Sequence, residues 1–194
     1  MSGAWRPVAL IGPAFVGKTS LVRYLTEHAA FHQIPTVTTR PPRPVESDGS
    51  ARRFLSAAEF TATCVGPEWV VTMAGSVHYA INVADVRAAA ARGPVVFESS
   101  LEGLSSYRAV LPDVAVTYLR PSDRARLDDA LAHSPDRPPG ERAARVIANR
   151  EWVDAEPAAD LCLTVPRLGR AQLAEFHRTA AARMLALARG PDDR

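Results

Sequence analysis

The sequence predicts an α/β fold in which a parallel sheet is flanked by helices, with a small inserted lobe and a short lid. Three mainly apolar segments are typical of buried strands: Val8–Ile11, Val95–Glu98 and Val114–Leu119. Helical patterns separate these runs, and strands that alternate with helices favour parallel pairing with right-handed crossovers. A stretch rich in proline and arginine interrupts the alternation, which indicates an insertion.

Composition limits the classes of protein that this chain can belong to. Its 194 residues, 47% of them hydrophobic, suffice for one domain with its own core. A net charge of +2 does not suggest nucleic-acid binding. No apolar run approaches the roughly 20 residues of a membrane helix, and the N-terminus lacks a signal-peptide pattern. We therefore expect a cytoplasmic protein without a membrane partner, as a monomer or homodimer.

The first half of the chain supplies the lobe as well as part of the core. Four prolines within residues 35–44 exclude a helix, so the region 35–53 is predicted to be an extended loop. Ser56 and Glu59 form a capping-box pattern at the start of the next helix. The elements expected here are helix Thr19–Glu27, helix Ser56–Cys64, strands Trp69–Met73 and His78–Ile81, and a helix capped by Asn82 that runs through Ala91.

The second half returns to the alternating pattern. Helices are expected near Leu101–Leu111, Asp123–Ala132, Glu141–Trp152 and Arg170–Leu187, with a last strand at Leu161–Val165. In the closing helix Leu173, Phe176, Ala180 and Met184 recur at core spacing. The predicted division is a core of residues 5–33, 82–133 and 141–189, a lobe of residues 34–81 and a lid of residues 134–140.

Residues 12–19 fit the G-x4-G-K-[ST] pattern between the first strand and the first helix, which is the context of a phosphate-binding P-loop. The loop consists of Gly12, Pro13, Ala14, Phe15, Val16, Gly17, Lys18 and Thr19. Its backbone N–H groups and the helix N-terminus favour phosphate. Lys18 would hold the β- and γ-phosphates of ATP, and the Thr19 hydroxyl would bind Mg²⁺.

Lys18 is the only lysine, against 22 arginines. GTPases of the P-loop class read guanine with an Asn-Lys-x-Asp segment, which needs a second lysine, so a kinase is the better class.

The residues after Pro35 resemble the guanylate kinase family. The resemblance rests on the stretch from Val37 to Gly49, which contains Thr38-Thr39-Arg40-Pro41-Pro42-Arg43 and Glu46. It rests also on Phe54, Ser56 and Glu59-Phe60, and on His78-Tyr79. It runs from about residue 7 to residue 104 and continues more weakly to the end. The family implies an α/β core, a lobe that binds a nucleoside monophosphate, and a lid.

The resemblance also implies roles for individual residues. Arg40 and Arg43 would grip the phosphate of the acceptor, and two guanidinium groups on a proline-stiffened loop suit that task physically. Tyr79 would hydrogen-bond the same phosphate. Arg137 and Arg145 resemble the lid arginines that close over the transferring phosphoryl group, and Glu98 matches a family aspartate near Mg²⁺, which it could hold through water.

The positions that read guanine in the family are altered. A family glutamate falls at Val71, or at Thr72 if the register shifts by one, and a family aspartate falls at Ser100. A family serine is replaced by Ile81, while Thr36 keeps the family's hydroxyl. Arg52 replaces a second phosphate-binding tyrosine. The family usually has glycine at the position of Phe15 in the P-loop, so the ring could reshape the edge of the loop.

These changes keep or increase the positive charge around the acceptor phosphate and remove the acidic groups that read guanine. A site that hydrogen-bonds a base is selective because polar groups left unmatched by another base are costly. Removal of both acids should therefore remove most of the preference for guanine. We therefore expect an ATP- and Mg²⁺-dependent phosphotransferase whose acceptor is a small phosphorylated compound, a nucleotide other than GMP or a modified nucleotide. The alternatives are a sugar phosphate acceptor, as in the related ribose bisphosphate kinases, true guanylate kinase activity, a non-catalytic phosphopeptide-binding module, or another P-loop kinase with a hydroxylated acceptor.

Overall fold

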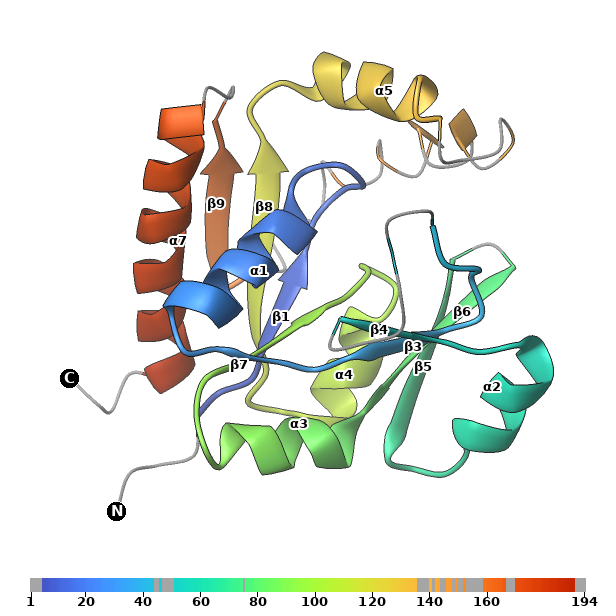
Figure 1. Cartoon of the computed structure of the whole chain (residues 1–194). Helices are drawn as coiled ribbons and strands as arrows, with labels where there is room; N and C mark the ends of the chain where they lie inside the picture. Colours follow the sequence, from blue (N-terminus) through green and yellow to red (C-terminus); the bar gives the residue numbers. More distant parts are fainter. Residues whose placement is uncertain are drawn as a thin grey trace.

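The computed structural model describes residues 5–43, 46, 51–74, 76–135, 140, 142–143, 146–147, 149, 152, 159–166 and 170–190. Within these ranges the strands form a five-stranded sheet of order β2-β7-β1-β8-β9 and a four-stranded sheet of order β4-β3-β6-β5. We call them the large sheet and the small sheet. Figure 1 shows the small sheet beside the large one, with the P-loop turn above the end of β1.

The large sheet is parallel throughout its described strands, as predicted. Its strands are β1 (Val8–Ile11), β2 (His32–Gln33), β7 (Val95–Glu98), β8 (Ala115–Pro121) and β9 (Leu161–Val165). The sequence prediction missed β2, because two residues show no periodicity. It placed β8 one residue early at its start and two residues early at its end.

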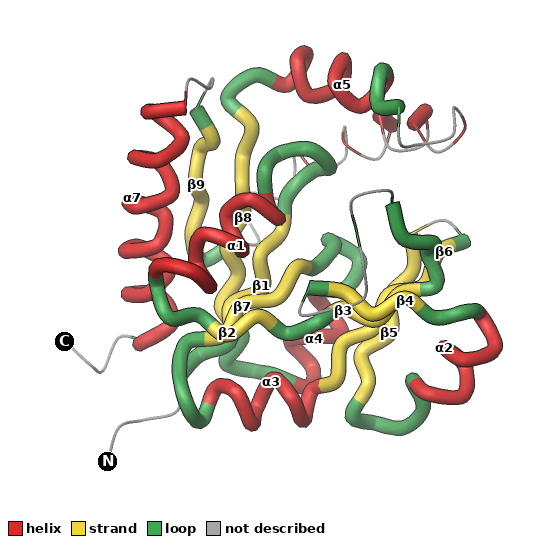
Figure 2. Tube along the Cα trace, viewed as in Figure 1, coloured by secondary structure: helices red, strands yellow, loops and turns green. Residues whose placement is uncertain are grey.

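Strand β1 is buried on both faces, which explains its continuous apolar run. Val8 and Leu10 pack in the cluster that holds residues of α1 (Lys18–His28) and α7 (Arg170–Arg189). The alternate residues, Ala9 and Ile11, pack in the cluster of α3 (Val83–Ala90) and α4 (Leu104–Val110). Helices therefore cover both faces of the large sheet, and Figure 2 shows α1 and α7 on the side away from α3.

The small sheet consists of β3 (Thr36–Thr38), β4 (Arg52–Phe54), β5 (Trp69–Ala74) and β6 (Val77–Asn82). The sequence predicted an extended loop over residues 35–53, and this prediction is wrong where the structure has strands β3 and β4. These strands have three residues each, and β3 is held between β4 and β6 by backbone pairing that local sequence does not reveal. The pairing stops before Pro41, which has no N–H to donate.

The register of the small sheet separates its side chains into two sets. Thr36 pairs with Arg52, Thr38 with Tyr79, and Tyr79 in turn with Thr72, so these five side chains share one face. On the opposite face Val37 and Ala80 pack against Phe60 of α2 (Ala57–Thr63). The first face is the one that lines the site described below.

Helices α1, α2, α3, α4, α5 and α7 lie where the sequence predicts helices, and their ends differ by a few residues. Much of the predicted helix 141–152 and of the predicted lid 134–140 lies outside the described residues. Helix α4 begins at Leu104 rather than near Leu101, and α5 is Arg124–Ala132 with Asp123 as its N-cap. Helix α7 extends to Arg189, and its buried residues include His177, Ala180 and Met184, while Leu173 and Phe176 are only partly buried. No helix in the described ranges is long and apolar enough to span a membrane.

Two helix caps confirm their predictions. The Ser56 hydroxyl accepts from the Glu59 N–H, and the Glu59 carboxylate accepts from the Ser56 N–H. At the start of α3, Asn82 Oδ1 accepts from the N–H groups of Ala84 (2.9 Å) and Asp85 (3.3 Å).

We predict that Asn82→Ala lowers the free energy of unfolding by about 1 kcal/mol, because both N–H groups lose their acceptor. Urea denaturation followed by circular dichroism measures this loss. Asn82→Ser, which can still cap the helix, should retain most of the stability. Equal loss in the two variants would contradict the capping role.

Candidate active site

The P-loop joins the end of β1 to the start of α1. Gly12 has φ +151°, and a Cβ there would lie 2.8 Å from the carbonyl oxygen of Leu119 on β8, so no larger residue fits. Gly17, with φ +100°, is the N-cap of α1. Both glycines of the motif are therefore required by the backbone, as the sequence pattern predicts.

Lys18 points back over its own loop. Its Nζ donates to the carbonyl oxygens of Gly12 (2.6 Å) and Pro13 (2.8 Å). The ammonium group thus lies at the centre of the loop's curve, where an incoming phosphate would meet it.

Phe15 fits the loop in a left-handed conformation, with φ +66°, which is uncommon for a bulky residue. Its side chain is 46% exposed and lines two neighbouring cavities. The ring therefore lies exposed at the edge of the loop, between the two cavities, and its effect on the shape of the loop stays a prediction.

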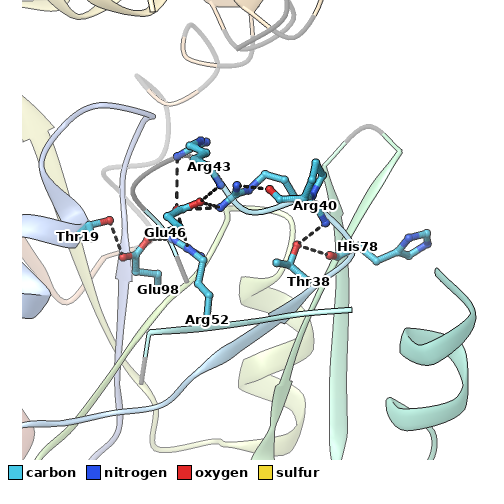
Figure 3. Close-up of polar contacts among 9 residues, drawn as sticks. Thr19, Thr38, Arg40, Arg43, Glu46, Arg52, His78 and Glu98 are labelled. Carbon is cyan, nitrogen blue, oxygen red and sulfur yellow. Dashed lines mark hydrogen bonds and ion pairs between the residues drawn. The ribbon is translucent and has the colours of Figure 1, made fainter. Parts of the chain in front are cut away.

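The loop between β3 and β4 holds a cluster of charges around Glu46 (Figure 3). The Arg40 guanidinium donates to Glu46 Oε1 at 3.0 Å and lies 2.8 Å from Oε2. The Arg43 backbone N–H donates to Oε2 at 3.0 Å, and its side chain lies 3.9 Å from Oε1. Partial burial acts to raise the pKa of Glu46, but the hydrogen bonds and charges of the two arginines outweigh it and hold the pKa below its ordinary value.

Arg52 connects this cluster to the P-loop. Its Nη2 donates to Glu98 Oε2 at 3.1 Å, and its Nε lies 3.7 Å from Glu46 Oε1. The other oxygen of Glu98 accepts from the Thr19 hydroxyl at 3.0 Å. A continuous polar chain thus runs from α1 through β7 and β4 to the Arg40 loop (Figure 3).

A single cavity of about 400 Å³ lies between the P-loop and the small sheet. The structure brings most of the predicted site residues together along its walls. These are Gly12, Ala14, Phe15, Gly17, Lys18 and Thr19 of the P-loop and Thr36, Arg40, Arg43, Arg52, Tyr79, Glu98 and Ser100. Pro13 and Val16 complete the loop without lining the cavity. Arg137 and Arg145 lie outside the described residues.

Neutral hydroxyl groups line part of the cavity, and they include those of Thr72 and Ser100. Thr72, and not Val71, faces the cavity, because Val71 lies on the α2 face of the small sheet. Ile81 is fully buried in the core and does not reach the cavity. Tyr107 also lines the cavity. Burial raises the pKa of its phenol, so the phenol remains neutral.

Sequence reasoning missed two residues that contact the loops of the site. Glu46 belongs to the motif that resembles the family but received no role. Asn149 accepts a hydrogen bond from the Ala14 N–H at 3.0 Å. No sequence signal points to this second contact, because it joins residues 135 positions apart.

Thr19 and Glu98 fit a magnesium ion. Both offer oxygen atoms, which Mg²⁺ prefers, and those atoms lie 3.0 Å apart. Because Mg²⁺ takes its remaining ligands from water and substrate phosphates, two protein oxygens are enough. The described residues contain no group of three or more His, Cys, Asp or Glu side chains arranged to hold a metal.

No protein-family model matches the chain. A guanylate kinase of Mycolicibacterium paratuberculosis is 35% identical over 154 residues, covering 77% of this chain and 67% of that protein. One of Nocardia farcinica is 36% identical over 150 residues, covering 75% of each.

Experimentally determined structures of other proteins have a fold similar to that of this chain. A guanylate kinase from Anaplasma phagocytophilum superposes with a TM-score of 0.69 at 14% identity, over 96% of this chain and 88% of that one. A gluconokinase from Sinorhizobium meliloti reaches 0.50 at 16% identity, over 94% and 93%. From its sequence relatives, the chain belongs to the guanylate kinase family.

Proposed function

We propose that this ATP-dependent nucleotide kinase transfers the γ-phosphoryl group of ATP to the phosphate of a nucleoside monophosphate. The observation that carries the proposal is one cavity with the P-loop on one wall and a cluster of cationic side chains on the other. The second wall, which we call the acceptor wall, consists of the cationic side chains of Arg40, Arg43 and Arg52 together with the neutral Tyr79.

On the donor side, Lys18 would give up its hydrogen bonds to the carbonyl oxygens of Gly12 and Pro13 and donate to phosphate oxygens of ATP instead. The N–H groups of the loop and the N-terminus of α1 would hold the rest of the triphosphate. Mg²⁺ held by Thr19, and by Glu98 through water, would neutralise charge on the phosphates.

On the acceptor side, the arginines would turn from Glu46 to the acceptor phosphate and fix it in line with the donor. A phosphate oxyanion is already a nucleophile, so the site needs no general base. Catalysis would then consist of positioning and charge stabilisation. We also propose that Arg137 and Arg145 neutralise the charge that develops on the phosphoryl group during its transfer.

GMP is the first candidate for the acceptor, because the relatives are named guanylate kinases. The comparisons give no support to the non-GMP acceptor expected from the sequence. One observation keeps a nucleotide other than GMP as a second candidate: the cavity is lined by the neutral residues Thr72 and Ser100. A hydroxyl can donate as well as accept, so these residues do not select guanine as a carboxylate would.

A panel of acceptors tests the proposal, with ADP release measured at saturating ATP and Mg²⁺. The panel contains GMP, IMP, AMP, CMP, UMP and ribose phosphates. We expect GMP to react, with kcat/KM for IMP or AMP within about 100-fold of it, because Thr72 and Ser100 stand where carboxylates would select guanine. A preference for GMP of about 10⁴-fold or more would exclude the second candidate. Reaction of ribose phosphates alone would contradict the proposed function.

Arg52 and Arg53 form a matched pair for testing the acceptor wall, because neighbours on a strand point to opposite faces. Loss of a charge-assisted hydrogen bond costs about 1.5–3 kcal/mol, so Arg52→Ala should raise the acceptor KM about 10- to 100-fold. Arg53→Ala, on the other face, should leave it unchanged. Steady-state kinetics measures both values. An unchanged acceptor KM in both Arg52→Ala and Arg40→Ala would favour a P-loop kinase with a hydroxylated acceptor.

Calorimetric titration with ATP addresses the phosphopeptide-binding alternative, since a non-catalytic module should not bind ATP. Cytoplasmic location and a monomeric or homodimeric state remain predictions.

A further inference from the structure

The side chain of Asn149 is packed against the P-loop. It is 4% exposed and lines the cavity that holds Lys18. Its backbone carbonyl accepts from the Arg124 guanidinium of α5 at 3.2 Å, which ties this residue to the core.

The orientation of the Asn149 amide follows from its partner. The Ala14 N–H can be met only by an acceptor, so Oδ1 must face the loop, 3.0 Å from the Ala14 nitrogen. The NH2 group, with two N–H donors, then points elsewhere. Among the described residues Nδ2 is buried and has no hydrogen-bond partner. A buried donor without an acceptor is unfavourable and uncommon in native proteins.

A phosphate oxygen in the P-loop would supply the missing acceptor. Ala14 belongs to the loop whose N–H groups face the phosphates, and the amide of Asn149 is already in contact with it. We infer that Asn149 is a binding residue for the donor triphosphate: Oδ1 orients the Ala14 N–H and Nδ2 donates to a phosphate oxygen. This inference rests on the proposed role of the P-loop.

Two substitutions separate a phosphate ligand from a residue that merely supports the loop. Asn149→Asp keeps an oxygen for the Ala14 N–H but replaces the donor with a negative charge. Asn149→Ala removes both groups. Titration calorimetry with ATP and with inorganic triphosphate, in the full-length protein, measures affinity without the acceptor. Thermal melting without ligand reports whether each variant folds.

If Asn149 donates to phosphate, both ligands should bind Asn149→Asp at least 10-fold more weakly than the wild type, and more weakly than Asn149→Ala. If Asn149 only supports the loop, Asn149→Asp should bind like the wild type while Asn149→Ala binds weakly, and that result would overturn the inference.

Lys18→Ala distinguishes this inference from the function on which it rests. It should weaken binding of inorganic triphosphate, because Lys18 faces the phosphates in either case. A normal affinity in Lys18→Ala would overturn the P-loop assignment itself. Weak binding in Lys18→Ala with normal binding in Asn149→Asp would overturn the role of Asn149 alone.

Discussion

Two carboxylates hold the guanidinium groups of the acceptor wall together. Glu46 lies 2.8 Å from the Arg40 guanidinium and Glu98 lies 3.1 Å from that of Arg52. Three partly buried arginines would otherwise repel one another across the cavity. Because Glu46 stays ionised, as its lowered pKa indicates, the cluster is ordered before a phosphate arrives. Under the proposed function, the acceptor phosphate would then take over bonds that the carboxylate now makes, with little reorganisation of the wall.

Glu98 belongs to both halves of the site. One oxygen accepts from Thr19 on the donor side and the other from Arg52 on the acceptor side. Glu98, at the end of β7, therefore links the arginine cluster to the P-loop through hydrogen bonds at both of its oxygens. Among the described residues, Thr72 and Ser100 of the cavity lining are uncharged. Under the proposed function, the part of the site that would bind phosphate is therefore more strongly specified than the part that would contact a base.

The sequence predicted the parts of this structure that local chemistry determines. The P-loop follows from its glycines and lysine between a strand and a helix, and the caps at Ser56 and Asn82 follow from residue type and spacing. Strands β3 and β4 could not be predicted, because three residues beside prolines show no period and depend on pairing with β6. The choice between Val71 and Thr72 depends on the register of β5 against β6. Asn149 and Ala14 are brought together only by the fold.

The central claim is that the acceptor atom is a phosphate oxygen held opposite the P-loop. Phosphorus NMR of the reaction product tests it most directly, with ATP, Mg²⁺ and the best acceptor of the panel. We expect coupled signals of a new diphosphate other than ADP, at the expense of the acceptor's monophosphate signal. A new phosphate ester on a hydroxyl group, with the acceptor's own phosphate unchanged, would contradict it.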